Sequence, residues 1–181
     1  MPRHSLAVLI AGLLILTPLA NPAQNKAALQ IGDPFPQLTG QTLTNKSLDL
    51  PAGAAGKPAV VVFSFTRTAG KDARVWNEHL SKDFSSVVPD YDVIVLESVP
   101  KLFRGMAVSG IRSSMPLPLQ DRTIVLYNDE ALWKARLAGS DYNRAYVVLL
   151  APDGHIRWIS TGAFTADSYT QFKNEVVKLS S

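Results

Sequence analysis

The chain is predicted to form one α/β domain with a mixed central sheet. Residues 59–65 are an almost continuous apolar, β-branched run, which is typical of a strand covered on both faces in a parallel sheet. A helical pattern and a second apolar run at residues 91–96 follow, enough for one right-handed crossover. Near the end, alternating runs at 145–150 and 155–161 flank a Pro-Asp-Gly turn and predict an antiparallel hairpin.

Residues 1–23 have the layout of a secretory signal peptide. Arg3 precedes an apolar run at 6–19, and the small residues Ala20 and Ala23 follow it. The run is shorter than the roughly 17–25 residues that span a bilayer. We therefore expect cleavage after Ala20 or Ala23 and a periplasmic or secreted protein, with an uncleaved membrane anchor as the alternative.

Glycine and proline punctuate residues 24–58, so this part is predicted to be an extended N-terminal segment that precedes the main domain at 59–181. Within that domain, the spacing of apolar residues predicts helices at 71–84, 101–114, 130–138 and 166–179. A short strand is expected at 123–127. Asn128 and Asp129 are candidate N-caps for the third helix, which Gly139 ends. Helical spacing places Phe103, Met106 and Trp133 in the core.

Composition excludes several kinds of chemistry. The net charge is only +3, and the basic residues are scattered among acidic ones. This pattern argues against a nucleic-acid-binding surface. His79 and His155 have no acid or sulfur ligands at metal spacing, so neither a metal nor a cofactor is expected. The chain contains no cysteine, so it cannot supply the thiolate that thiol-disulfide exchange needs as its nucleophile.

The order of the predicted elements resembles the thioredoxin-like fold in its redoxin form, a three-layer α/β/α sandwich. VVVFSFTRTAGKDAR at 60–74 is similar to the segment that bears the Cys-x-x-Cys pair in exported thioredoxin-like proteins. Ala69 and Asp72 stand at the positions of the two cysteines. Ala145 replaces the cis-proline of the family, and a trans peptide is expected there because a cis bond before a non-proline residue costs about 3 kcal/mol.

Within that superfamily, the chain resembles the mitochondrial ATP synthase assembly factor ten family, which assists assembly of the enzyme's membrane sector. The similarity covers about residues 31–179 and rests on residues 32–36, on the tryptophan-bearing helix with Trp76, and on residues 154–158. It implies a cysteine-free binding or assembly protein whose partner is another protein, with a membrane protein as one candidate client.

The candidate partner-binding residues surround the lost redox position and continue on the hairpin: Arg67, Thr68, Arg74, Trp76, Tyr142, Arg144, Arg157 and Trp158. Arg67, Lys71 and Arg74 lie near a helix start and oppose its dipole, which costs about 0.3–1 kcal/mol per charge. This placement points to an acidic partner or an anion. The alternatives are that these three side chains extend into solvent, and that residues 157 and 158 shield a sheet edge.

The sequence is therefore consistent with two functions. The first is a redox-inactive, thioredoxin-like binding or assembly protein of the bacterial envelope, with no catalytic residue. The alternative is an oxidoreductase relative that acts with a separate thiol partner. Insulin reduction and peroxide consumption by the purified chain distinguish the two.

Overall fold

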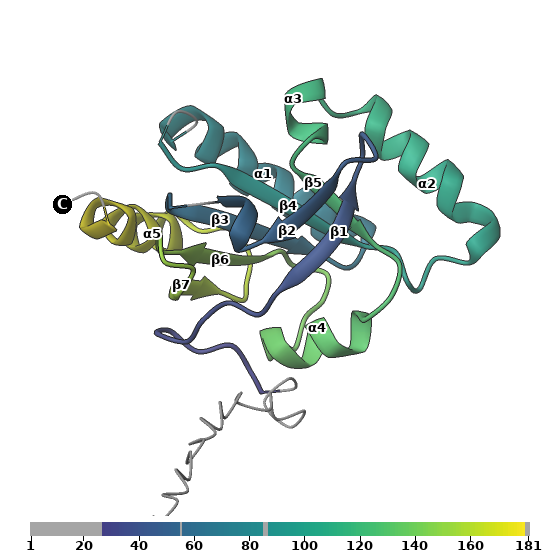
Figure 1. The fold of residues 1–181 in the computed structure, drawn as a ribbon. Helices are drawn as coiled ribbons and strands as arrows, with labels where there is room; N and C mark the ends of the chain where they lie inside the picture. Colours follow the sequence, from purple (N-terminus) through teal and green to yellow (C-terminus); the bar gives the residue numbers. More distant parts are fainter. Residues whose placement is uncertain (1–26, 55, 85–86, 180–181) are drawn as a thin grey trace, which may run out of the picture.

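The computed structural model describes residues 27–54, 56–84 and 87–179 (Figure 1), so the predicted signal peptide lies outside the described residues. A seven-stranded sheet has the order β2-β1-β5-β4-β3-β6-β7. Its strands are β1 (Leu38–Thr42), β2 (Ser47–Leu50), β3 (Ala59–Ser64), β4 (Asp90–Val95), β5 (Thr123–Leu126), β6 (Tyr146–Leu150) and β7 (Ile156–Ser160). The β3–β4 and β4–β5 pairs are parallel and the other pairs antiparallel, which confirms the predicted mixed sheet.

The predicted crossover is formed by β3, α1 (Arg67–Phe84) and β4. Every residue of β3 is buried, as expected for a strand covered on both faces. Helix α1 begins at Arg67 and not at residue 71. Thr66 explains the earlier start, because its hydroxyl Oγ1 accepts the Ala69 N–H at 3.1 Å and satisfies an otherwise free donor of the first turn.

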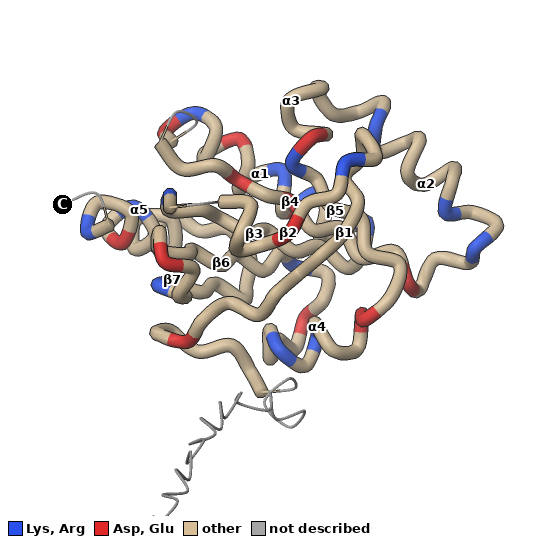
Figure 2. Tube along the Cα trace, in the orientation of Figure 1, with Lys and Arg blue, Asp and Glu red and all other residues tan. Residues whose placement is uncertain are grey.

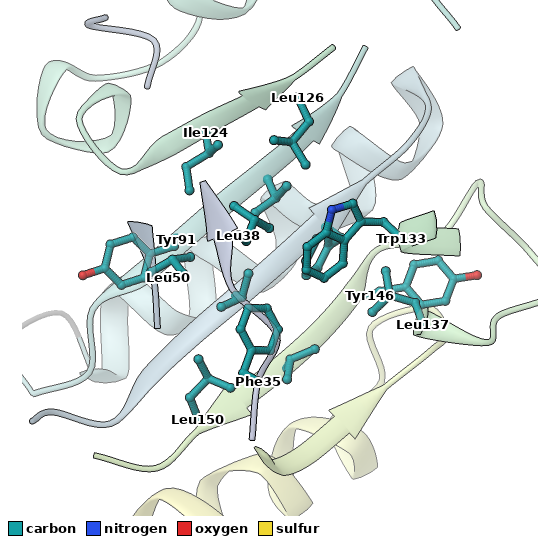
Figure 3. Packing of buried hydrophobic residues seen from close by; sticks show 14 of the residues in the cluster. Phe35, Leu38, Leu50, Tyr91, Ile124, Leu126, Trp133, Leu137, Tyr146 and Leu150 are labelled. Atoms are coloured by element: carbon teal, nitrogen blue, oxygen red, sulfur yellow. The ribbon is translucent and has the colours of Figure 1, made fainter. Parts of the chain in front are cut away.

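Helices cover both faces of the sheet. On one face α1 and α5 (Ala166–Leu179) pack against alternate residues of β3 such as Val60 and Val62. On the other face, α4 (Glu130–Leu137) places Trp133 against Phe63, with 5.0 Å between ring centroids. Figure 3 shows Trp133 among Phe35, Leu38 and Leu126. The core is therefore split in two by the sheet, as in a three-layer sandwich.

Part of the predicted extended N-terminal segment belongs to this same sheet. Residues 38–50 form the β1–β2 hairpin, and β1 pairs with β5 through Gln41 and Thr42. Gly40 permits the close approach, because a Cβ there would lie 2.3 Å from Cγ2 of Ile124. A short 3-10 turn, η2 (Ala52–Ala54), leads on to β3. The boundary drawn at residue 58 therefore does not separate two structural units.

Helix α2 (Lys101–Ser113) packs loosely and is followed by the unpredicted α3 (Leu117–Gln120). No residue of α2 is buried, and only its inner side contacts the small cluster of Leu43, Leu96 and Val125. The expectation that Phe103 and Met106 lie in the core is wrong, because they are 50% and 71% exposed. The same expectation for Trp133 is confirmed, since only 3% of it is exposed.

The C-terminal hairpin forms as predicted, with Gly154 at φ 83° in its turn. The start of α4 differs from expectation, because neither Asn128 nor Asp129 caps it with a side chain. Instead, the Glu97 carboxylate accepts the Glu130 N–H at 2.6 Å from a preceding loop. Among the residues that the structure describes, no helix has both the length and the apolar character to cross a membrane.

Candidate functional site

The degenerate redox position lies where β3 ends and α1 begins. Ala69 is fully buried and Asp72 is half-buried, one turn apart on the first turns of α1. Thr66, just before the helix, lies 3.4 Å from the carbonyl oxygen of Tyr142 and 3.2 Å from Oδ1 of Asn143. The loop before β6 therefore rests directly on the start of α1, as the resemblance to redoxins implies.

Asp72 holds that loop through its carboxylate. Oδ2 accepts the N–H of Ala145 at 2.9 Å, and Oδ1 accepts the N–H of Phe164 at 3.4 Å. One side chain thus joins α1, the loop before β6 and the loop after β7. The Ala145 contact depends on the missing proline, because proline has no N–H to donate. A hydrogen bond therefore joins the two positions that the resemblance aligns with a cysteine and with the cis-proline of redoxins.

The peptide bond before Ala145 is trans, as predicted. In the described part of the chain, the cis peptide bond is Leu50–Pro51. Ala145 itself is fully buried. An alanine stands here in place of the proline ring, and the Asp72 carboxylate contacts the loop through the Ala145 N–H.

Replacing Asp72 by alanine is expected to lower the free energy of unfolding by about 1–3 kcal/mol, because two backbone N–H groups lose their acceptor. Urea unfolding of the variant checks the magnitude. Amide hydrogen exchange should become faster at Ala145 and Phe164 before it changes elsewhere. Glu78→Ala, on the exposed side of the same helix, is the matched control and should change stability by less than about 0.5 kcal/mol. Equal losses in the two variants would contradict the bridging role.

The predicted cations form an exposed row on α1. Arg67, Lys71 and Arg74 are spaced by four and three residues, so they share one helix face, and all three are exposed. Thr68 is exposed beside them. The first turn of α1 contains no acidic residue. We call Arg67, Lys71 and Arg74 the basic row. It offers a positive surface next to the degenerate redox position.

Tyr142 and Arg144 reach the same region through the loop before β6. Arg144 is exposed and pairs with Asp141 across 3.6 Å, a distance at which a surface ion pair adds little stability. Tyr142 is half-buried, with its ring 4.6 Å from Nζ of Lys134 and 5.5 Å from the ring of Phe65. Of these two side chains, Arg144 is the one that a partner can reach freely.

Trp76 and Trp158 do not belong to this surface. Trp76 is fully buried, and Trp158 is buried beside it, with 5.8 Å between the ring centroids. Phe164, Tyr169 and Phe172 complete the aromatic cluster between α1, α5 and β7. The prediction that these two tryptophans contact a partner is therefore wrong. They hold helices on the sheet instead.

Arg157 is exposed, but it lies near the end of the strands that is opposite to the basic row. Its neighbour Ile156 pairs with Leu150, which pairs with Ala59 at the start of β3. The basic row follows the opposite end of β3. Since β7 is an edge strand, an exposed arginine there fits the alternative interpretation of edge protection.

The surroundings of the basic row hold no cluster of metal ligands among the described residues. In the described ranges, no three His, Cys, Asp or Glu side chains are grouped to hold a metal ion. The His79 ring stacks on Phe164 at 4.3 Å and serves packing. A cavity of about 440 Å³ lies between β1 and α4. Its walls include Trp133, so it belongs to the opposite face of the sheet.

One carboxyl group is buried under α1. Oδ1 and Oδ2 of Asp92 on β4 each accept from the Asn77 amide at 2.9 Å. Burial raises the pKa of Asp92 to about 7, although the hydrogen bond from Asn77 acts in the opposite direction. Asp90 raises this pKa further, and Arg122, which pairs with Asp90 at 2.8 Å, lowers it. Oδ1 of Asn77 is buried and has no hydrogen-bond partner among the described residues.

Sequence reasoning missed one surface feature. Leu102, Phe103 and Met106 project from the first turns of α2, with Leu102 86% exposed. Helical spacing could not reveal this, because it shows which residues share a face but not whether that face is covered. The one sequence feature that sets this segment apart is that residues 98–120 contain no aspartate or glutamate.

Comparison with solved structures places the fold among thioredoxin-like proteins. The thioredoxin domain of a thiol-disulfide oxidoreductase from Bacteroides vulgatus matches with a TM-score of 0.59 and 18% identity, covering 82% of this chain and 99% of that one. BsSco, a member of the Sco family of cytochrome c oxidase assembly proteins, matches with a TM-score of 0.57 and 14% identity, covering 83% and 98%. An exposed lipoprotein thioredoxin from Streptococcus pneumoniae matches with a TM-score of 0.54 and 12% identity, covering 77% and 99%.

No curated protein matches this chain. The family described as ATP10 protein matches residues 24–179, which include every described strand and helix. The predicted resemblance is thereby confirmed, and the thioredoxin-like fold with it. The chain belongs to the ATP10 protein family and is a cysteine-free, thioredoxin-like member of it.

Proposed function

We propose that this protein is a redox-inactive binding protein of the bacterial envelope that assists the assembly of a protein partner. The main observation is the hydrogen bond from Ala145 N–H to Asp72, a structural contact at the position that the resemblance to redoxins aligns with one of the two cysteines. Membership of the ATP10 protein family supports an assembly role. BsSco, whose family name includes the assembly of cytochrome c oxidase, provides a parallel on the same fold.

The partner surface is the basic row with Thr68 and Arg144. All five side chains are exposed, and they surround the position at which redoxins meet their substrates. Such a row attracts acidic segments and accelerates their association. The proposal therefore assigns an acidic protein segment to this surface, and a membrane protein remains one candidate client. A periplasmic location, with residues 1–23 either cleaved or retained as an anchor, is part of the same proposal.

In-cell photo-crosslinking tests the surface. With p-benzoylphenylalanine at Thr68, a discrete crosslinked protein is expected, and Arg67→Glu with Arg74→Glu should lower its yield about tenfold, because like charges repel across an interface. Lys173→Glu with Lys178→Glu on α5 is the charge-matched control and should leave the yield unchanged. Crosslinking from Asn174, also on α5, checks background capture.

Two results would count against this function. Equal losses from both charge reversals would show that net charge, and not the basic row, determines capture. Insulin reduction or peroxide consumption by the purified chain would show that it remains an oxidoreductase. We expect neither.

A further inference from the structure

The first turns of α2 form an exposed apolar tip. Leu102, Phe103 and Met106 are 86%, 50% and 71% exposed, and we call these three residues the α2 tip. In Figure 1, α2 lies at the outer edge of the molecule, at the right, away from the helices that cover the sheet. Leu102 and Met106 are four residues apart, so they lie one turn apart on the same helix face.

The inner side of α2 is already anchored. Ala107, Val108 and Ile111 pack on the cluster beneath the helix. Arg104 donates from Nε to the carbonyl oxygen of Val99 at 2.9 Å and from its guanidinium to that of Glu97 at 2.9 Å. The helix is therefore held in place without the α2 tip, and its outward apolar residues add nothing to the core.

The charged residues of α2 itself are all basic, and the nearest acidic residue before the helix is Glu97, whose carbonyl oxygen Arg104 contacts. Residues 98–120 contain Lys101, Arg104 and Arg112 and no aspartate or glutamate, and Figure 2 shows blue but no red along α2. The Arg104 guanidinium also lies 5.2 Å from the ring of Tyr127, which is itself exposed. A protruding Leu, Phe and Met group with flanking cations and an aromatic ring is the composition of an interfacial membrane contact.

We propose that the α2 tip inserts into the headgroup region of an anionic lipid bilayer. A bilayer suits this surface, because the apolar residues project outward and neither described cavity is lined by any part of α2. Lys101 meets lipid phosphates while its stem follows the apolar residues inward. Membrane contact by α2 leaves the basic row on α1 as a separate surface.

The absence of cysteine makes the test direct, because one introduced cysteine is the only site for a thiol-reactive dye. The full chain is labelled with NBD at Leu102→Cys or Met106→Cys and mixed with phosphatidylcholine vesicles, with or without phosphatidylglycerol. A blue shift and brightening are expected at both positions with anionic vesicles. Val177→Cys on α5, a residue 62% exposed, is the control and should stay in a watery environment.

Affinity is then measured by vesicle titration of the full chain, so that residues 1–26 are the same in every variant. Leu102→Gln with Met106→Gln should weaken binding to anionic vesicles about tenfold. Lys101→Gln should weaken it about fivefold, as expected for one basic residue at the surface. Val177→Gln should change nothing, and unchanged melting temperatures would confirm that all variants fold.

The proposal would be overturned if the dyes at 102 and 106 stayed in water while the protein sedimented with vesicles. It would also be overturned by equal blue shifts with zwitterionic and anionic vesicles, since the positive charge would then have no role. An affinity unaffected by Leu102→Gln with Met106→Gln would overturn it as well.

Discussion

Replacing Trp76 by alanine is expected to lower the free energy of unfolding by about 3–5 kcal/mol, because the substitution leaves a large cavity between α1 and the sheet. The indole is fully buried and lies 5.1 Å from Phe164 and 6.0 Å from Tyr169, between ring centroids. For a domain of this size the melting temperature should fall by roughly 10 °C. Thermal and urea unfolding measure both quantities.

The variant Trp76→Phe separates the effect of lost packing volume from the effect of losing the indole N–H. The Trp76 Nε1 has no hydrogen-bond partner among the described residues, so phenylalanine loses volume but also removes an unsatisfied donor. Its cost should be about 1–2 kcal/mol. Arg74→Ala, exposed on the same helix, should change stability by less than about 0.5 kcal/mol. If Trp76→Ala kept full stability but lost the crosslinked partner, the assignment of Trp76 to the core would fail.

The contribution of Asp92 to the free energy of unfolding is expected to decrease as the pH rises from about 4 to about 8. Its folded-state pKa of about 7 exceeds the ordinary value of 3.8, so the folded state binds a proton that the unfolded state has already lost. The stabilisation is complete below pH 4 and is lost as the pH passes through 7. Since one pKa unit corresponds to about 1.4 kcal/mol, the total change is of the order of 4 kcal/mol.

Asp92→Asn should remove this dependence. An amide is neutral at every pH, so the variant should be about 2–4 kcal/mol more stable than the natural chain at pH 8. Urea unfolding from pH 4.5 to 8.5 provides the comparison. Asp49→Asn on β2, an exposed carboxyl, serves as the control. Parallel stability curves for the natural chain and Asp92→Asn would disprove the assignment.

The sequence predicts those parts of the fold whose burial pattern is long and regular. All six residues of β3 are buried, and the hairpin turn at Gly154 needs a positive φ, so both leave a clear trace in the sequence. Strand β2 has four residues and leaves no such trace, which is why the N-terminal strands were not recognised. The first turn of α1 was assigned to a loop, because a single hydroxyl on Thr66 determines its start.

The structure brings some of the residues proposed for the candidate site together and places others in the core. The resemblance to redoxins aligned Ala69, Asp72 and Ala145, and the structure brings Asp72 and Ala145 into contact. Spacing could not show that Trp76 faces inward. Aromatic residues occur on both the buried and the exposed face of an amphipathic helix, and Trp76 follows directly after the exposed Val75. For Phe103 and Met106 the error was the reverse, since helical spacing placed these exposed side chains in the core.

The link between Asp72 and Ala145 makes the gain of thiol chemistry by single substitutions difficult. Cysteine at 72 would remove the acceptor, and proline at 145 would remove the donor, so each change alone forfeits the same hydrogen bond and gains no activity. A working enzyme would also need cysteine at 69, where the alanine is completely enclosed. Thiol-disulfide exchange of the redoxin kind at this place would therefore require at least three coordinated substitutions.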